Sequence, residues 1–343
     1  MKKWPWKRIL VLLISFAVLI GFILFDPDVK QIDEVIAQMD PIWLLGAFAC
    51  VLLYYLGDTL MYLIACRNMQ IPQKFHEGLL TTMLGFFYSA VTPLASGGQP
   101  FQVIQMRSRG INVGTATSVL MVKFMAWHIT LSLFGILGVI FRGGLLIAES
   151  TTMFVMFIIG FLAHAICAIT GMLLMIKPDW VSRAGNAVCR FVGRVFFKKR
   201  PEMTDKMLTT FDGFVSDYKQ AVSFALKYKG GMLLILLTAV VEVAAYISVT
   251  YFVYRGLGFS EASFFTLFFM QAMLLISVAF IPLPGAAGAS EGGFYAIFTA
   301  FFDGARLAGM LLWRVLTYYL TIAVGMVFVL IDGFRKKKRE EQA

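Results

Sequence analysis

Charged side chains occur inside stretches of this chain that are otherwise apolar, and they are the residues whose types could do chemistry. An ionised residue at the centre of a membrane-spanning helix costs about 2.5 to 3.5 kcal/mol on insertion scales, so each one is a candidate functional residue. Carboxylates can bind a cationic or hydroxylated group, and a guanidinium can hold a phosphate in a bidentate pair. The residues are Asp58, Lys123, His128, His164, Glu242, Glu291 and Arg314.

Four of these residues are expected to reach the middle of the membrane from different segments. Glu242 lies at the middle of its apolar run, while Asp58 and Arg314 lie about four residues, or ~6 Å, to the inner and outer side of theirs. Glu291 lies at a break between two apolar runs. We expect Asp58, Glu242, Glu291 and Arg314 to form a binding site. The alternative is a set of buried ion pairs that join helices, although such pairs rarely add net stability.

The other three residues are expected to have structural roles. Lys123 is expected to extend its long side chain toward the inner surface, with its ammonium group in water. His128 and His164 are expected to form hydrogen bonds between helices rather than to act as ligands.

The apolar runs that carry these residues are long enough to cross a bilayer. The chain has 343 residues, of which 59% are hydrophobic and 15% charged, and its mean hydropathy is +0.79. A spanning helix needs about 20 apolar residues, and we expect six such spans. They are 9–25, 42–66, 115–141, 152–176, 231–254 and 308–331.

Two further apolar segments, 79–91 and 264–280, end in breaks rich in proline and glycine. The first break reads TPLASGGQP (92–100) and the second IPLPGAAGASEGG (281–293). Irregular backbone at membrane depth survives only where it is buried in protein or lines a wet cavity, so each segment predicts a re-entrant hairpin. The alternative is close helix packing at small residues. The expected cavity residues are Pro93, Gly97, Gly98, Gln99, Pro100, Pro282, Pro284, Gly285, Gly288 and Ser290.

The two hairpins are expected to enter from opposite sides, as in an inverted-repeat transporter. The run from Ala90 to Leu94 matches the run from Ala279 to Leu283, with Pro93 against Pro282. The predicted fold is therefore an all-α integral membrane protein with six full spans and two re-entrant hairpins, or seven to eight spans in another count.

The distribution of basic residues predicts the orientation. Most of the 30 Lys and Arg residues lie at the two ends of the chain and in three connections, so both termini are expected in the cytoplasm. We divide the chain into a first half (1–176), an amphipathic helical connector on the inner leaflet (177–229), a second half (230–333) and a basic tail (334–343).

Several other chemistries are not expected. The cysteines Cys50, Cys66, Cys167 and Cys189 have neither disulfide nor metal spacing, no nucleotide-binding motif is present, and we expect no metal and no cofactor. The positive charge of +10 is assigned to topology and anionic lipids rather than to nucleic acid. Gly288-Ala-Ser290-Glu-Gly292 matches G-x-S-x-G, which leaves an intramembrane serine protease as a minor alternative that would need a histidine base.

Three motifs together resemble the lysylphosphatidylglycerol synthase transmembrane-region family, the flippase-like part of the multiple peptide resistance factor. The resemblance covers about residues 5–335. It rests on TP…GG…P in the first half, on Pro282 to Glu291 in the second, and on Arg314 with the tyrosines that follow it. Ala286 departs from the paired glycine that is common in the second motif.

The resemblance implies a protein of the bacterial plasma membrane that moves phosphatidylglycerol, or an aminoacylated derivative of it, across the bilayer. The cytosolic synthase domain of full-length members is expected to be absent, because the chain stops at RKKKREEQA. The alternatives are a phosphatidylglycerol lysyltransferase or its membrane partner, with a role in resistance to cationic antimicrobial peptides, and a membrane scaffold. Expected partners are membrane phospholipids, a separate synthase or glycosyltransferase, and a second copy of the chain.

Overall fold

The described part of the chain is a bundle of long helices. A computed structural model describes residues 37, 39–198 and 201–340, and every regular element there is helical. The expected span 9–25 lies outside the described residues. The helices long and apolar enough to cross a membrane are α3 (Pro41–Asn68), α6 (Val113–Glu149), α7 (Thr151–Ile176), α10 (Lys229–Gly256) and the helix Arg306–Arg335. They coincide with the other five expected spans, which confirms an all-α, multi-pass membrane protein.

Proline and side-chain caps fix where several of these helices begin. Pro41 occupies the first turn of α3, where its missing N–H is not needed, and the carboxylate of Asp40 accepts a hydrogen bond from the amide of Ile42 at 2.9 Å. The hydroxyl of Ser150 caps α7 by accepting from the amide of Met153 at 3.2 Å. Each cap satisfies an amide that would otherwise lack a partner.

The last long helix changes its pitch in the middle. It consists of α13 (Arg306–Arg314), a π-helical turn η4 (Val315–Tyr319) and α14 (Leu320–Glu340). A π turn rotates the side chains that follow it relative to those before it, and such turns occur often at functional sites.

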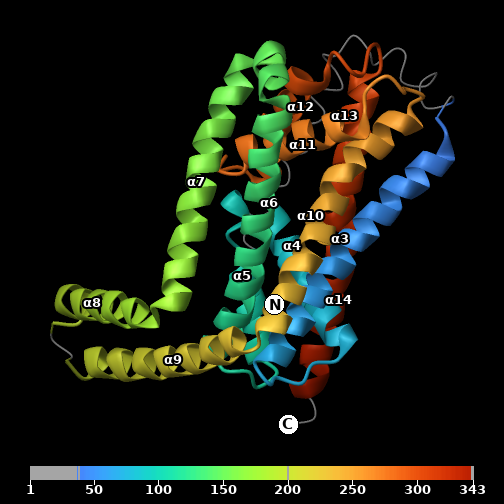
Figure 1. The fold of residues 1–343 in the computed structure, drawn as a ribbon. Helices are drawn as coiled ribbons and strands as arrows, with labels where there is room; N and C mark the ends of the chain where they lie inside the picture. The colour runs from blue at the N-terminus through green and yellow to red at the C-terminus, as the bar shows by residue number, and fades with distance from the viewer. Residues whose placement is uncertain (1–36, 38, 199–200, 341–343) are drawn as a thin grey trace.

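The expected connector is a pair of helices that lies across one end of the bundle (Figure 1). These helices are α8 (Pro178–Phe196) and α9 (Pro201–Lys227). Tyr218 and Val222 of α9 are buried, and α9 packs against α6, whereas Val188 and Phe191 of α8 are exposed. We call this end of the molecule the connector end and the other one the far end. The position of α8 on the inner leaflet stays a prediction.

Two short hairpins with broken tips enter the bundle from opposite ends (Figure 1). The first hairpin starts at the connector end, where α3 finishes, and the second starts at the far end, where α10 finishes. Their tips, η2 and η3, contact each other. The first hairpin consists of α4 (Phe75–Ala90), η2 (Pro93–Ala95) and α5 (Gly98–Arg107), and the second of α11 (Phe264–Val278), η3 (Pro284–Ala286) and α12 (Ala289–Phe298).

The backbones of the two tips match in a different register from the one that the sequence suggested. Pro93 begins η2 and Pro284 begins η3, and the residue after each proline, Leu94 or Gly285, is left-handed with φ of 53° or 58°. The expected match of Pro93 with Pro282 is therefore wrong by two residues. Backbone conformation decides the match, because the left-handed turn after the proline redirects the chain.

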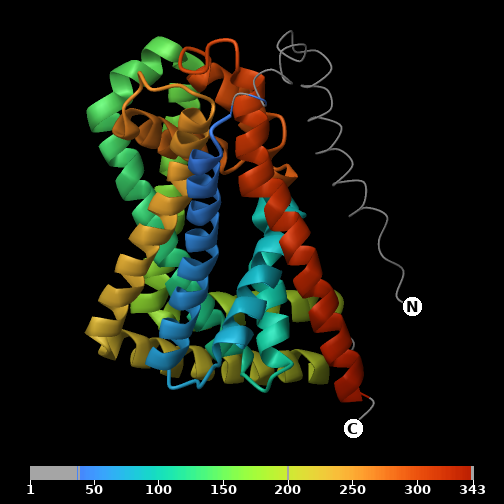
Figure 2. The same cartoon turned by 90° about the vertical axis from the view of Figure 1, so that its right-hand side faces the viewer.

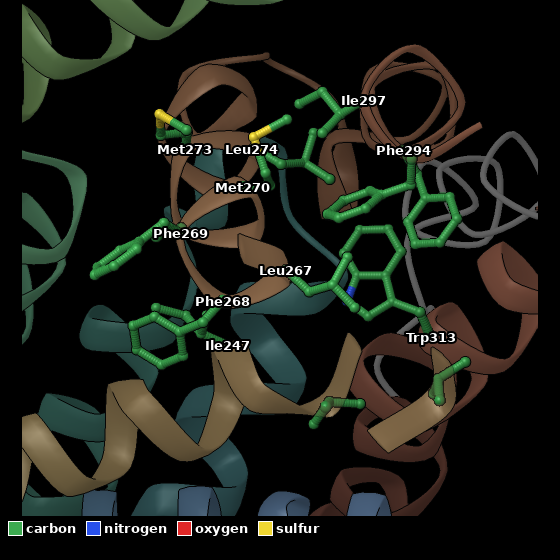
Figure 3. Close-up of a cluster of buried hydrophobic side chains, with 14 of the residues drawn as sticks. Ile247, Leu267, Phe268, Phe269, Met270, Met273, Leu274, Phe294, Ile297 and Trp313 are labelled. Atoms are coloured by element: carbon green, nitrogen blue, oxygen red, sulfur yellow. The ribbon is translucent and has the colours of Figure 1, made fainter. Parts of the chain in front are cut away.

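The second hairpin is embedded in the largest apolar core of the described chain. Phe294 and Phe298 of α12 and Met270 and Leu274 of α11 have no exposed surface, and Trp313 stacks on Phe294 with ring centroids 5.4 Å apart (Figure 3). By contrast, the tip of the first hairpin is largely exposed, and Leu94 keeps 51% of its surface accessible. The structure therefore fixes the second hairpin more firmly than the first.

We expect Gly160→Ala to destabilise the protein, because α7 and α11 touch at this residue. A Cβ atom on Gly160 would lie 2.1 Å from the backbone oxygen of Ile276, so the two helices would have to separate. Overpacking of this kind costs about 1 to 3 kcal/mol. The melting temperature in detergent should fall. Gly144→Ala is the matched control, since a Cβ atom on Gly144 of α6 would meet nothing within 4 Å. Equal melting temperatures for the two variants would contradict the tight packing of α7 on α11.

Candidate lipid site

A cavity of about 230 Å³ opens beside the first hairpin. Its walls come from both halves of the sequence, since α3, the first hairpin and α6 form most of the lining and α10 contributes Glu242. The lining residues are Tyr54, Asp58, Gly85, Phe86, Ser89, Ala95, Gln99, Gln102, Leu120, Lys123, Phe124, Trp127 and Glu242. The broken tip therefore borders a hollow space, as irregular backbone at membrane depth requires.

A buried ion pair crosses this cavity between α3 and α6. The ammonium of Lys123 lies 2.7 Å from a carboxylate oxygen of Asp58, and the hydroxyl of Thr82 on α4 donates to the same oxygen at 2.8 Å. Lys123 retains 8% of its surface and Asp58 6%. The expectation that Lys123 extends to the inner surface is wrong, because a buried carboxylate lies within its reach.

Glu242 is the second carboxylate at the cavity, and it has no counter-charge of its own. It has no exposed surface, and within the described residues neither of its carboxylate oxygens has a hydrogen-bond partner. A Cβ atom on Gly57 would lie 2.8 Å from the Cβ of Glu242, so glycine at that position lets α10 approach α3 closely. The two helices lie side by side in both views (Figures 1 and 2). A buried polar group without a partner is unusual and calls for an explanation.

Aromatic rings form much of the cavity wall. Tyr54 on α3 and Phe86 on α4 stack with their ring centroids 4.6 Å apart, and Phe124 and Trp127 line the α6 side. The face of an aromatic ring attracts a cation, and the attraction grows where water is excluded. Carboxylates surrounded by such rings suit an ammonium-bearing ligand.

A second buried ion pair holds the tip of the second hairpin. The Nε of Arg314 lies 2.6 Å from one carboxylate oxygen of Glu291, and its NH2 group donates to the carbonyl of Gly285 at 2.9 Å. The other oxygen of Glu291 accepts from the amide of Gly288 at 2.7 Å. Arg314 and Glu291 are 5% and 1% exposed. This pair stabilises the left-handed turn from two sides, and neither residue lines the cavity of about 230 Å³.

The π turn links this second tip to the first hairpin. The hydroxyl of Tyr318 donates to the carbonyl of Ala90, the last residue of α4, at 3.0 Å. The ring of the same tyrosine covers Gly285 so closely that a Cβ atom there would lie 2.3 Å from it. Glycine at this position is thus required both by its positive φ and by the ring above it.

Lys123 and Arg314 hold equivalent positions in the two halves. Lys123 follows Pro93 by 30 residues, and Arg314 follows Pro284 by 30 residues. Each base lies on the helix after a hairpin, and each pairs with a buried carboxylate. The partners differ, because Asp58 lies on the helix before the first hairpin whereas Glu291 lies within the second hairpin.

The structure thus divides the four expected site residues into two groups. Asp58 and Glu242 share the cavity, while Glu291 and Arg314 form the ion pair at the second tip. Sequence reasoning missed Lys123 as a cavity residue. The signal was present in the equal spacing from Pro93 to Lys123 and from Pro284 to Arg314, but it becomes visible only once the two prolines are correctly matched.

The expected residues of the two breaks also separate. Gln99 lines the cavity, and Gly98 lets α5 pack on α4, since a Cβ atom there would lie 2.0 Å from the hydroxyl oxygen of Ser89. Ser290 donates to the carbonyl of Gly285 at 3.2 Å. The remaining members of the set form the tips or adjoin them and are absent from the cavity lining: Pro93, Gly97, Pro100, Pro282, Pro284, Gly285 and Gly288.

The two buried histidines hydrogen-bond to each other. The Nδ1 atoms of His128 on α6 and His164 on α7 lie 2.7 Å apart, which confirms the expected hydrogen bond between helices. Ser290 uses its hydroxyl on a backbone carbonyl instead. The arrangement that a serine nucleophile requires, with a base at its hydroxyl, is not seen among the described residues.

Comparison with known proteins places this architecture in a family. A sequence model of the family described as the lysylphosphatidylglycerol synthase TM region matches residues 8–325. The chain belongs to this family. The chain is also similar to a UPF0104 membrane protein of Archaeoglobus fulgidus, with 23% identity over 308 residues. The aligned region covers 86% of this chain and 88% of that protein. The family assignment agrees with the resemblance carried by the two broken segments and by the span that contains Arg314.

Removal of one partner of the second-tip ion pair is expected to be costly. Arg314→Met leaves Glu291 charged and buried, and Glu291→Gln leaves Arg314 in the same condition. Such changes cost about 3 to 5 kcal/mol. The double variant should be less destabilised than the sum of the two, with a coupling of about 1 to 3 kcal/mol in detergent unfolding curves.

Arg142→Met serves as the control for this cycle. Its guanidinium is partly buried and hydrogen-bonds to the hydroxyl of Thr266 and the carbonyl of Phe141 rather than to a carboxylate. Its effect should be much smaller than that of Arg314→Met. Strictly additive effects of the changes at Glu291 and Arg314 would show that the pair does not hold the second tip.

Proposed function

We propose that this protein moves a phospholipid with a cationic head group between the leaflets of a prokaryotic plasma membrane. The observation that carries the proposal is the cavity beside the broken first hairpin, where two carboxylates, one ammonium and several aromatic rings meet. Broken helices that meet near the middle of a membrane are typical of transporter substrate sites. The family assignment supports a role in lipid chemistry, since its description names a lysylphosphatidylglycerol synthase.

The charges of the cavity match an aminoacylated phospholipid. Asp58 and Glu242 can accept hydrogen bonds from an ammonium group, and the aromatic wall adds attraction for the cation. Lys123 can pair with the lipid phosphate when the head group takes over its place beside Asp58. The acyl chains would remain in the bilayer, so the cavity has to accommodate the head group alone.

The basic residues support an orientation for this movement. Residues 177–229 and the basic C-terminal region are rich in Lys and Arg, which favours the connector end on the cytoplasmic side. On this assignment the first hairpin and its cavity start from the cytoplasmic side, where newly made lipids enter. A separately encoded synthase would be a suitable partner for supplying the lipid.

A transferase activity is the second candidate, because the family description contains the word synthase. Incubation of the purified protein with phosphatidylglycerol and lysine-charged tRNA separates the two functions. Lysine incorporation into lipid by this chain alone would favour the transferase, whereas the transporter predicts none.

Reconstitution in liposomes tests the transporter. The liposomes contain lysylphosphatidylglycerol, and a membrane-impermeant amine reagent reports the fraction exposed in the outer leaflet. Wild-type protein should make the inner-leaflet lipid accessible. Asp58→Asn should slow this exchange about tenfold or more, equivalent to at least about 1.4 kcal/mol, because Lys123 loses its counter-charge and the head group loses a carboxylate.

Asp179→Asn is the matched carboxylate control. Asp179 lies on α8, outside the spans, and the hydrogen bond and positive charge of Lys219 lower the pKa of its exposed carboxyl. Asp179 is ionised at neutral pH and is remote from the cavity, so its variant should exchange lipid at the wild-type rate. Exchange no faster than in protein-free liposomes, for wild type and with every lipid tried, would refute the transporter.

A further inference from the structure

We propose that Glu242 binds a proton and that the proton and the cationic head group compete for this one carboxylate. The inference rests on the proposed function and adds an energy source to it. The starting point is a carboxylate with no exposed surface and no hydrogen-bond partner among the described residues, at the inner wall of an open cavity.

The charges around the cavity do not balance without a further cation. Asp58 and Glu242 supply two negative charges, and Lys123 supplies one positive charge, which lies 2.7 Å from Asp58. Thr82 donates to Asp58 as well, so both contacts are made to the carboxylate of Asp58, whereas neither oxygen of Glu242 has a hydrogen-bond partner among the described residues. A buried charge without a partner is strongly destabilising, and one proton bound to Glu242 neutralises that charge.

The neighbouring elements provide no other counter-charge. Tyr54 on α3 and Tyr246 on α10 face this region, and both are neutral phenols in water. The positive charge of Arg314 is close enough to interact with Tyr246, but its guanidinium is already bound to Glu291 and to the carbonyl of Gly285, so it does not neutralise Glu242. The α4 and α5 residues at the cavity are uncharged.

A proton suits this place better than a metal cation. Sodium and calcium need several oxygen ligands, but α3 and α10 are continuous helices here, and their carbonyl groups are used in helix hydrogen bonds. No group of three or more His, Cys, Asp or Glu residues with metal-binding geometry occurs within the described residues. Aromatic rings make up much of the remaining wall. A proton needs only one of the two oxygens of Glu242.

Competition at Glu242 couples the movement of the lipid to the movement of a proton. When an ammonium group reaches the carboxylate, the proton leaves the oxygen for water in the cavity and the carboxylate pairs with the ammonium instead. When the head group leaves, a proton from the other side returns to the oxygen. A lipid with one net positive charge is thus exchanged for one proton, and no net charge crosses the membrane.

The first test is infrared difference spectroscopy of the purified protein at neutral pH, with the C=O band of a protonated carboxylic acid as the readout. The band should be present, shift in heavy water, and disappear in Glu242→Gln. Asp179→Asn should retain it. Addition of lysylphosphatidylglycerol should bleach the band in wild type, which tests the competition without any variant and so does not depend on how Glu242→Gln folds. Absence of the band, or a band that the lipid leaves unchanged, would overturn the proposal.

The second test uses a pH difference across the liposome membrane. The lipid should accumulate in the leaflet that faces the acidic side, by up to about tenfold per pH unit for one-to-one exchange. An ionophore that exchanges potassium for protons should abolish the accumulation. Accumulation that follows a sodium gradient, or exchange that ignores both gradients, would overturn proton coupling and leave the transporter intact. If no lipid moves under any condition, the transporter itself fails, and the infrared band then decides the proton site alone.

Discussion

The unpaired backbone N–H and C=O groups of two broken helices need hydrogen-bond partners, and the hydrocarbon of a membrane provides none. The rest of the structure depends on how the protein supplies these partners. An unpaired N–H or C=O group costs several kcal/mol in hydrocarbon. At the second tip, Arg314 and Glu291 satisfy the carbonyl of Gly285 and the amide of Gly288, and Ser290 contributes a further bond. The two tips also contact each other, and Tyr318 joins the end of α4 to the π turn. The helices can therefore be broken at depth because each tip is supported by groups from outside its own hairpin.

The two halves share the position of a basic residue, but this residue has a different environment in each half. Lys123 and Arg314 lie at the same distance after equivalent prolines, but the guanidinium is fixed within a packed core while the ammonium lies in an open cavity. Arginine suits the first role because its planar fork binds a carboxylate and a carbonyl together, and lysine suits the second because its single ammonium can change partners more easily. The second hairpin is thus held by a fixed ion pair, while the first borders a cavity in which an ion pair meets a further carboxylate.

Much of the fold follows from the sequence, because length and hydropathy decide it. Five described spans, both hairpins and the amphipathic connector occur where the pattern of apolar residues predicts them. The register of the two breaks could not be predicted in the same way. Leu94 adopts a left-handed conformation that its side chain disfavours, so the type of this residue gives no sign that the turn falls there. The pair of Lys123 with Asp58 joins residues 65 positions apart and depends on how α6 lies against α3, which no local pattern reports.

Stability does not account for the charged cavity, since apolar packing of the same volume would serve a stable fold at least as well. Asp58 and Lys123 neutralise each other in an ion pair. Burial of Glu242 is unfavourable, and no hydrogen bond among the described residues offsets this cost. Gly57 increases that cost, because it brings α3 against the stem of Glu242 where a larger residue would have kept the helices apart. A residue in such a place contributes through something it binds, and a buried carboxylate beside a cavity lined by aromatic rings suits a positive charge. The charge of Glu242 has to be neutralised at every stage of transport, by a proton or by a head group. This requirement is sufficient to couple the movement of protons to the movement of the lipid.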